Sequence, residues 1–160
     1  GFSLVRKIID DNNTIEKEFK KISNLNFYDE LLKPTTIYNN LIQKILAENI
    51  EIKAMSHITG GGIPENLPRS MPSDFIPYIN TNSWDIPILF KFLKDKGSIP
   101  KKDFWNTFNL GVGFCLIIDK QFKDAILNIC KDHYIESWEI GKIVRKNDST
   151  ISKFLPEILT

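Results

Sequence analysis

The sequence has few of the residues that most often carry chemistry. Its 160 residues include two cysteines, two histidines and two methionines. No histidines and cysteines stand at metal-ligand spacing, and no Gly-x-Ser-x-Gly segment marks a nucleophile elbow. Both Cys115 and Cys130 lie in apolar segments, which favours buried, reduced thiols of a cytosolic protein. A disulfide or a nucleophilic role stays open, but no neighbouring residue supports either.

Long apolar runs and an excess of one charge are also missing. The longest apolar stretch, 112–118, is far shorter than the roughly 20 residues of a membrane-spanning helix. Lysine and arginine total 21 against 20 aspartates and glutamates, and no basic stripe of a nucleic-acid binder occurs. Apolar residues make up 42% and charged residues 26%, as in globular proteins. We therefore expect a cytoplasmic protein that binds neither nucleic acid nor membrane.

The length fits a single domain with a hydrophobic core of its own. The chain opens at Gly1 without an initiator methionine, and apolar residues share one helical face from Phe2 onward. No basic and apolar leader precedes this pattern. Because a natural N-terminus seldom starts in this way, we expect residues 1–160 to be a fragment of a longer protein.

Apolar spacing predicts helices and strands in a mixed order. Helices are predicted from Phe2 and at 85–96, 98–107 and 121–132, with a helical turn at 63–69. A further helix is predicted to be capped by Thr35 or Thr36, and its apolar face consists of Ile37, Leu41, Ile45 and Leu46. The predicted strands are 50–56, 111–119 and 135–144. Residues 14–32 give no clear preference, 70–83 predict an irregular connection, and a polar turn should follow Arg145. This order indicates an α/β (α+β mixed) domain with helices packed on a layered sheet.

Three consecutive glycines, Gly60, Gly61 and Gly62, follow the first predicted strand and precede a turn with Pro64 at its first helical position. Glycine permits positive φ and close approach of a ligand to the backbone. The N–H groups and dipole of a following helix would face the same place. The pattern predicts a phosphate cradle, although a tight turn that needs glycine for its backbone conformation explains it equally well.

Polar residues around these glycines could act with them. His57 offers a hydrogen-bond donor or a proton-transfer group, and Thr59 offers a hydroxyl. Arg69 could pair with a phosphate. The other histidine, His133, ends a predicted helix and fits a surface or capping role. Gly111-Val112-Gly113 is too short for a dinucleotide-binding fingerprint.

Several short segments follow one another in a recognisable order. They are Gly1–Lys7, Leu31–Thr35 with Ile37-Tyr38, His57–Gly62 with Glu65–Arg69, the series Trp84, Pro87, Phe90 and Gly97, Thr107–Gly113, and Ile140-Gly141. Collinear from residue 1 to about 145, they resemble the phosphoribosylformylglycinamidine cyclo-ligase family, the aminoimidazole ribonucleotide synthetases. The chain departs from the family's pattern at Thr36, where a basic residue is usual, and at Asp103-Phe104, where Glu-Met is commoner.

The resemblance implies the C-terminal domain of a homodimeric two-domain enzyme of purine biosynthesis. The family uses ATP, with Mg²⁺, to activate the formyl oxygen of formylglycinamidine ribonucleotide, and the amidine then closes the ring of aminoimidazole ribonucleotide. ATP and Mg²⁺ would bind mainly through the N-terminal domain, which is absent from residues 1–160. We therefore expect the isolated chain not to close the ring.

The resemblance also assigns roles to residues of this domain. It implies that His57 is the catalytic residue. The implied substrate-binding and phosphate-binding residues are Thr59, Gly60, Gly61, Gly62, Asn66, Arg69, Asn109, Gly111 and Gly113. For 109–113, a buried strand eased by glycine is an equally good interpretation.

Two alternatives remain. The first is a related ATP-using enzyme of the thiamine monophosphate kinase or selenophosphate synthetase type, which shares the two-domain layout. Those enzymes are expected to lack the joined segments 57–62 and 66–69. The second alternative is a phosphate-binding or assembly module without catalysis.

Overall fold

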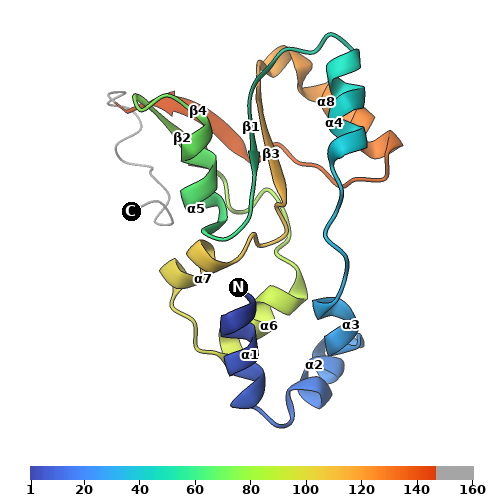
Figure 1. Cartoon of the computed structure of the whole chain (residues 1–160), viewed down its shortest axis with the longest axis vertical. Coiled ribbons are helices and arrows are strands. Elements are labelled where there is room, and N and C mark those ends of the chain that lie inside the picture. Colours follow the sequence, from blue (N-terminus) through green and yellow to red (C-terminus); the bar gives the residue numbers. More distant parts are fainter. Residues whose placement is uncertain (147–160) are drawn as a thin grey trace.

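The computed structural model describes residues 1–146, in which four helices precede the first strand and helices and strands are mixed thereafter (Figure 1). The helices are α1 (Phe2–Asp10), α2 (Ile15–Ser23), α3 (Phe27–Leu31), α4 (Asn39–Ala47), α5 (Gly62–Asn66), α6 (Ile88–Lys96), α7 (Lys101–Thr107) and α8 (Lys123–Asp132), with 3₁₀ turns η1 (Leu67–Ser70) and η2 (Lys120–Phe122). The strands are β1 (Ile52–His57), β2 (Phe75–Ile79), β3 (Phe114–Ile118) and β4 (Gly141–Arg145). The mixed class predicted from the sequence is confirmed.

Within residues 1–146, four strands form two antiparallel pairs instead of one continuous sheet. β1 pairs with β3, with His57 opposite Phe114 at one end and Ile52 opposite Ile118 at the other. β2 pairs with β4. Because β1 and β3 run in opposite directions, the loop that leaves β1 and the loop that enters β3 emerge at the same end of the pair.

Two hydrophobic clusters hold these elements together. The larger one unites α1, α2, α3, α6 and α7 with β2 and β3, and these helices lie together in the lower part of Figure 1. Its centre is aromatic, because the rings of Phe19, Phe27 and Phe92 have centroids 5.2 to 6.0 Å apart. The smaller cluster joins α4 and α8 through Leu41, Ile45 and Ile126.

Helix α4 begins later than the sequence predicts. Thr35 and Thr36 do not cap it, and the helix begins at Asn39. Ile37 is 82% exposed and Leu46 is 45% exposed, whereas Leu41 and Ile45 face the core as predicted. Residues 33–38 form no helix because they cross from α3 to α4 between the two groups of helices (Figure 1), and extended backbone spans more distance per residue.

Two strand predictions also need correction. The segment 70–83, predicted irregular, contains β2, and the predicted strand 135–144 shortens to β4. Pro77 lies within β2, in the segment predicted as irregular, and is opposite Ile143 in the pair. Each strand of a two-stranded sheet is an edge strand, where the missing N–H of proline is tolerated. The region 14–32, without a clear prediction, forms α2 and α3, and the turn expected after Arg145 lies largely outside the described residues.

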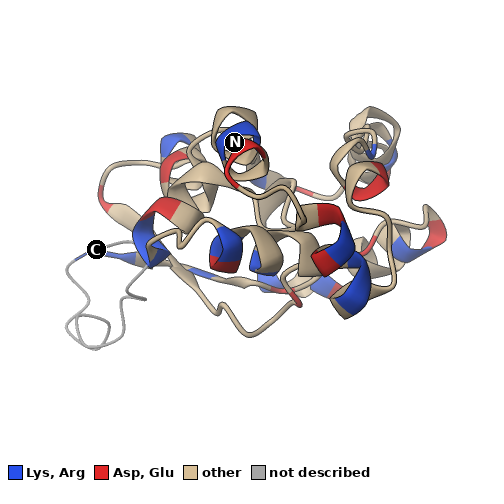
Figure 2. Cartoon of the chain, turned by 90° about the horizontal axis from the view of Figure 1, so that it is seen from below, with Lys and Arg blue, Asp and Glu red and all other residues tan. Residues whose placement is uncertain are grey.

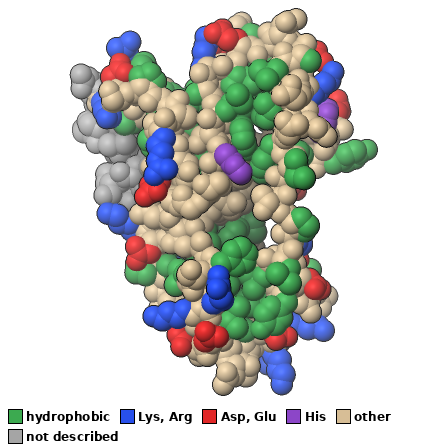
Figure 3. All heavy atoms as spheres, in the orientation of Figure 1, with side chains coloured by type: hydrophobic (Ala, Val, Ile, Leu, Met, Phe, Trp, Pro, Cys, Tyr) green, Lys and Arg blue, Asp and Glu red, His purple; other side chains and the backbone are tan. Residues whose placement is uncertain are grey.

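The surface carries interspersed charges. Lys and Arg lie among Asp and Glu over the helices in Figure 2. Figure 3 shows hydrophobic side chains gathered over two areas of one face, one near α4 and one over the lower helices. Among residues 1–146, no helix is long and apolar enough to cross a bilayer.

Neighbouring residues on α4 offer a test of the smaller core. Ile45 is fully buried, whereas Leu46 is 45% exposed. Replacing Ile45 by Ala should lower the free energy of unfolding by about 2–5 kcal/mol, because it leaves a cavity. Leu46→Ala should cost about 1 kcal/mol or less. Urea unfolding of both variants measures the difference, and equal losses would contradict this packing.

Candidate functional site

The glycine loop, residues 58–62, connects β1 to α5 by a tight turn. The N–H of Ile58 donates to the carbonyl of Gly113 at 2.9 Å, and the N–H of Gly62 donates to the carbonyl of Thr59 at 3.0 Å. Gly61 has φ +95° and Gly62 has φ +59°, conformations that side chains with a Cβ rarely adopt. Helix α5 begins at Gly62, so Pro64 occupies its third position and not the first.

The three glycines have different surroundings. A Cβ on Gly62 would lie 1.9 Å from the carbonyl oxygen of Trp105, so this glycine permits the loop to pack against α7. A Cβ on Gly61 would meet the Glu65 side chain. Gly60 has nothing within 4 Å of its Cβ position. Of the three, Gly60 therefore presents its backbone to open space, where a ligand could approach.

Asn66 holds the glycine loop in shape. Its Nδ2 donates to the carbonyls of Gly62 at 2.8 Å, Gly60 at 3.0 Å and Thr59 at 3.4 Å. The hydroxyl of Thr59 donates to Asn66 Oδ1 at 3.3 Å. Because both ends of the amide are used within the loop, Asn66 acts here as a loop support.

Arg69 lies on the surface beside the loop. Its guanidinium is 3.1 Å from the Glu65 carboxylate, and its side chain is 69% exposed. Such an exposed pair adds little stability, so the guanidinium can exchange its partner for another anion. The sequence reasoning missed Glu65 as a partner, although the spacing of four residues on a helical segment is a usable signal.

Residues 109–113 form a turn next to the glycine loop, and the strand predicted at 111–119 begins only at Phe114, in β3. Asn109 Oδ1 accepts the N–H of Gly111 at 3.2 Å, and Gly111 has φ +95°. The indole N–H of Trp84 donates to the carbonyl of Leu110 at 2.9 Å. Through Gly113, which bonds to Ile58, this turn lies against the glycine loop.

His57 ends β1 and is exposed at the entrance of the glycine loop. Its ring centroid is 5.9 Å from that of Phe114 and 6.1 Å from that of Tyr38. Neither Phe114 nor Tyr38 was among the predicted site residues, because no spacing in the sequence indicates that they lie near His57. The second histidine, His133, is exposed at the end of α8 with Nδ1 2.9 Å from the Ile129 carbonyl, as its predicted capping role requires.

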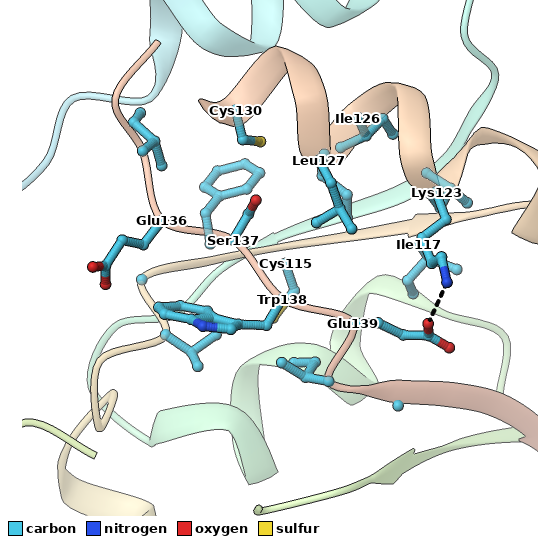
Figure 4. Close-up of a pocket in the computed structure, with 18 of the residues that line it drawn as sticks. Cys115, Ile117, Lys123, Ile126, Leu127, Cys130, Glu136, Ser137, Trp138 and Glu139 are labelled. Carbon is cyan, nitrogen blue, oxygen red and sulfur yellow. Dashed lines mark ion pairs between the residues drawn. The ribbon is translucent and has the colours of Figure 1, made fainter. Parts of the chain in front are cut away.

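A cavity of about 880 Å³ lies next to these loops along the free edge of β3. Figure 4 shows its walls, with α8 on one side and the segment containing Ser137 and Trp138 on the other. Lys123 and Glu139 form an ion pair of 3.2 Å at its border. The lining includes Gly111 and Gly113 but neither His57 nor residues 60–62. We place the candidate site at the loops, where polar groups converge, and not at the cavity, whose lining mixes apolar residues with charged ones such as Lys123 and Glu139.

Both cysteines line this cavity as buried, free thiols, as predicted. Burial raises the pKa of Cys115 to about 12. Burial also raises the pKa of Cys130, partly opposed by a hydrogen bond with Ser137. Both thiols are therefore protonated at neutral pH and poor nucleophiles. Among residues 1–146, no group of three or more His, Cys, Asp and Glu side chains could hold a metal ion.

Comparison with known protein families places the domain. Residues 1–153 match the family described as AIR synthase related protein, C-terminal domain. The chain belongs to the AIR synthase C-terminal domain family.

Several relatives of this domain are named phosphoribosylformylglycinamidine cyclo-ligase. The protein from Prochlorococcus marinus strain MIT 9312 is 86% identical over 160 residues, which are 100% of this chain and 46% of that protein. The protein from strain AS9601 is 84% identical over the same shares. The protein from strain NATL1A is 45% identical over 150 residues, 94% of this chain and 43% of that protein. The chain thus spans about half the length of the curated relatives it matches.

The different surroundings of the glycines lead to a matched prediction. Gly62→Ala should lower the free energy of unfolding by at least about 2 kcal/mol, because it strains the backbone and collides with Trp105. Gly60→Ala should change it by no more than about 0.5 kcal/mol. Thermal and denaturant unfolding of both variants test this, and a tolerated Gly62→Ala would show that the loop is arranged differently.

The buried thiol predicts a pH dependence of stability. The pKa of Cys115 rises from 9.0 to about 12 in the folded chain. The folded state therefore keeps a proton that the unfolded state loses. The stability that the neutral thiol contributes is complete below pH 9.0 and is lost as the pH rises to about 12. The free energy of unfolding should fall less steeply over this range for Cys115→Ala than for the native chain, and parallel curves would contradict the assignment.

Proposed function

We propose that this chain is the C-terminal domain of an ATP-dependent cyclo-ligase that converts formylglycinamidine ribonucleotide to aminoimidazole ribonucleotide in purine biosynthesis. The observation that carries the proposal is the junction of two loops at one end of the β1–β3 pair, in a domain whose relatives bear the cyclo-ligase name. These names favour the cyclo-ligase over a thiamine monophosphate kinase or a selenophosphate synthetase. The enzyme is a cytoplasmic homodimer in this proposal.

The glycine loop suits an anionic oxygen. In the described part of the chain, the backbone N–H groups of Thr59, Gly60 and Gly61 donate to no other group. Neighbouring N–H groups in a turn form a concave anion site. Gly60 leaves the approach open, and Arg69 stands nearby on the surface. These groups would bind a phosphate of the substrate, with Asn66 supporting the loop and Asn109, Gly111 and Gly113 forming the adjoining wall.

His57 and Thr59 supply the polar side chains at this place. In the proposed reaction, ATP transfers a phosphoryl group to the formyl oxygen. The amidine nitrogen then attacks the formyl carbon, and phosphate leaves with that oxygen. The imidazole of His57 can accept the proton that the attacking nitrogen loses or donate a hydrogen bond to the departing phosphate. The exposed hydroxyl of Thr59 can orient the substrate.

ATP and Mg²⁺ are assigned mainly to the other part of the enzyme. The described residues provide no cluster of carboxylates for a divalent cation, so no residue of this chain is proposed to hold magnesium. The glycine loop offers backbone donors to a phosphate but no complete nucleotide site. We therefore propose that the isolated chain does not close the ring.

A chimaera tests the proposal. This chain would replace the matching segment of the cyclo-ligase from Prochlorococcus marinus strain MIT 9312, with which it is 86% identical. The chimaera should produce aminoimidazole ribonucleotide and ADP from formylglycinamidine ribonucleotide and ATP. His57→Ala in this chimaera should lower kcat by about 100-fold or more, because it removes a proton-transfer group.

The second histidine provides the matched control. His133 is exposed on α8 and distant in sequence from the loops, so His133→Ala should leave kcat and KM unchanged. A chimaera that folds but makes no product would refute the proposed reaction. Native kinetics of the His57→Ala chimaera would refute the role of His57.

A further inference from the structure

Tyr38 is the one side chain that turns inward at the end of the crossing segment between α3 and α4. Every residue from 32 to 37 is exposed, whereas Tyr38 is half-buried. Its ring centroid lies 5.2 Å from that of Phe114 and 6.1 Å from that of His57. The crossing segment is therefore fixed to the β1–β3 pair at the position of His57.

Gly113 provides the space for this tyrosine. A Cβ at Gly113 would lie 2.1 Å from the Tyr38 hydroxyl oxygen and 3.1 Å from the ring carbon that bears it. Unlike Gly61 and Gly111, Gly113 does not have a positive φ. Its backbone conformation is open to any residue, so the need for glycine here comes from the hydroxyl of Tyr38.

Phe114 borders His57 on the opposite strand. The two residues are paired across β1 and β3, and their rings are nearly parallel, with an interplanar angle of 29° and centroids 5.9 Å apart. Tyr38 contacts both rings. Aromatic rings from two separate elements therefore restrict the orientation of the His57 imidazole, which is otherwise exposed.

We propose that Tyr38 is a positioning residue that holds the His57 imidazole at the entrance of the glycine loop, and that Gly113 is small in order to seat the Tyr38 hydroxyl. The consequence for turnover rests on the proposed function of His57. The contact itself does not, so structure and activity can be tested separately. Burial raises the pKa of Tyr38, so its hydroxyl stays protonated near neutral pH.

Nuclear magnetic resonance of the 160-residue chain tests the positioning directly, because His57 and His133 are its two histidines. Tyr38→Leu should shift the ring-proton resonances of His57 and weaken the cross-relaxation between His57 and Phe114. Tyr38→Phe should retain both signals. The resonances of His133 should stay constant in all variants, which also reports that the fold is intact.

A matched control and a double variant sharpen the test. Tyr28→Leu removes another tyrosine that contacts a phenylalanine, with ring centroids 5.5 Å apart, and should leave His57 unchanged. Gly113→Ala should disturb His57 as Tyr38→Leu does. Adding Tyr38→Phe should rescue Gly113→Ala, since the closest clash is with the hydroxyl. The proposal would be overturned if the His57 resonances were unchanged in Tyr38→Leu. It would also be overturned if Tyr38→Phe did not reduce the effect of Gly113→Ala on His57.

The chimaera adds the functional measurement. Tyr38→Leu should lower kcat about tenfold or more with a smaller change of KM, because a misplaced catalytic group slows the chemical step. Tyr38→Phe should keep most of the activity, and Tyr28→Leu should keep all of it. An inactive unsubstituted chimaera refutes the proposed function, while the resonance experiment still decides the positioning. An active chimaera with unchanged kcat in Tyr38→Leu overturns the positioning role.

Discussion

The hydrogen bond from Ile58 N–H to the Gly113 carbonyl is the constraint on which the site depends. It extends the β1–β3 pairing beyond His57 and Phe114 and ties together two loops that are more than 50 residues apart in sequence. The carbonyls of Trp105 and Phe108 then lie against Gly62, so α5 and α7 pack through the same junction. Strand pairing thus determines which polar groups meet, and the helices fix the angle at which the loops leave the sheet.

Within this junction, glycine has several separate roles. Gly61 and Gly111 adopt positive φ, Gly62 combines positive φ with close packing, and Gly113 leaves space for a tyrosine hydroxyl. Of these glycines, only Gly60 has neither a positive φ nor a neighbouring atom within 4 Å of its Cβ position. The tight-turn interpretation therefore explains most of the triple glycine, and the phosphate interpretation depends on Gly60 and on the N–H groups beside it. The turn geometry accounts for Gly61 and Gly62, and phosphate binding at Gly60 stays a proposal.

The sequence predicted the features that depend on local patterns. Helices α6, α7 and α8 follow their apolar spacing, α6 and α7 also follow a flanking proline, and β1 follows its alternation. Predictions were wrong where distant contacts decide the conformation. Ile37 continues the helical period of Leu41, yet it is exposed in the segment that crosses from α3 to α4. Strand β2 forms by pairing with β4 although it contains Pro77. The contact of Tyr38 with His57 could not be predicted from apolar periodicity, because it joins residues from different elements.

The exposure of His57 and Thr59 bears on how such a site could work. A phosphoryl group carried on a formyl oxygen is prone to attack by water, and enzymes protect such intermediates by excluding solvent. The loops provide donors on one side and aromatic rings around the imidazole, but within residues 1–146 no element covers them. A ring-closing site at this place therefore requires a second wall. This chain spans about half the length of the cyclo-ligases to which it is similar. Under the proposed function, the other half of the enzyme would supply this second wall.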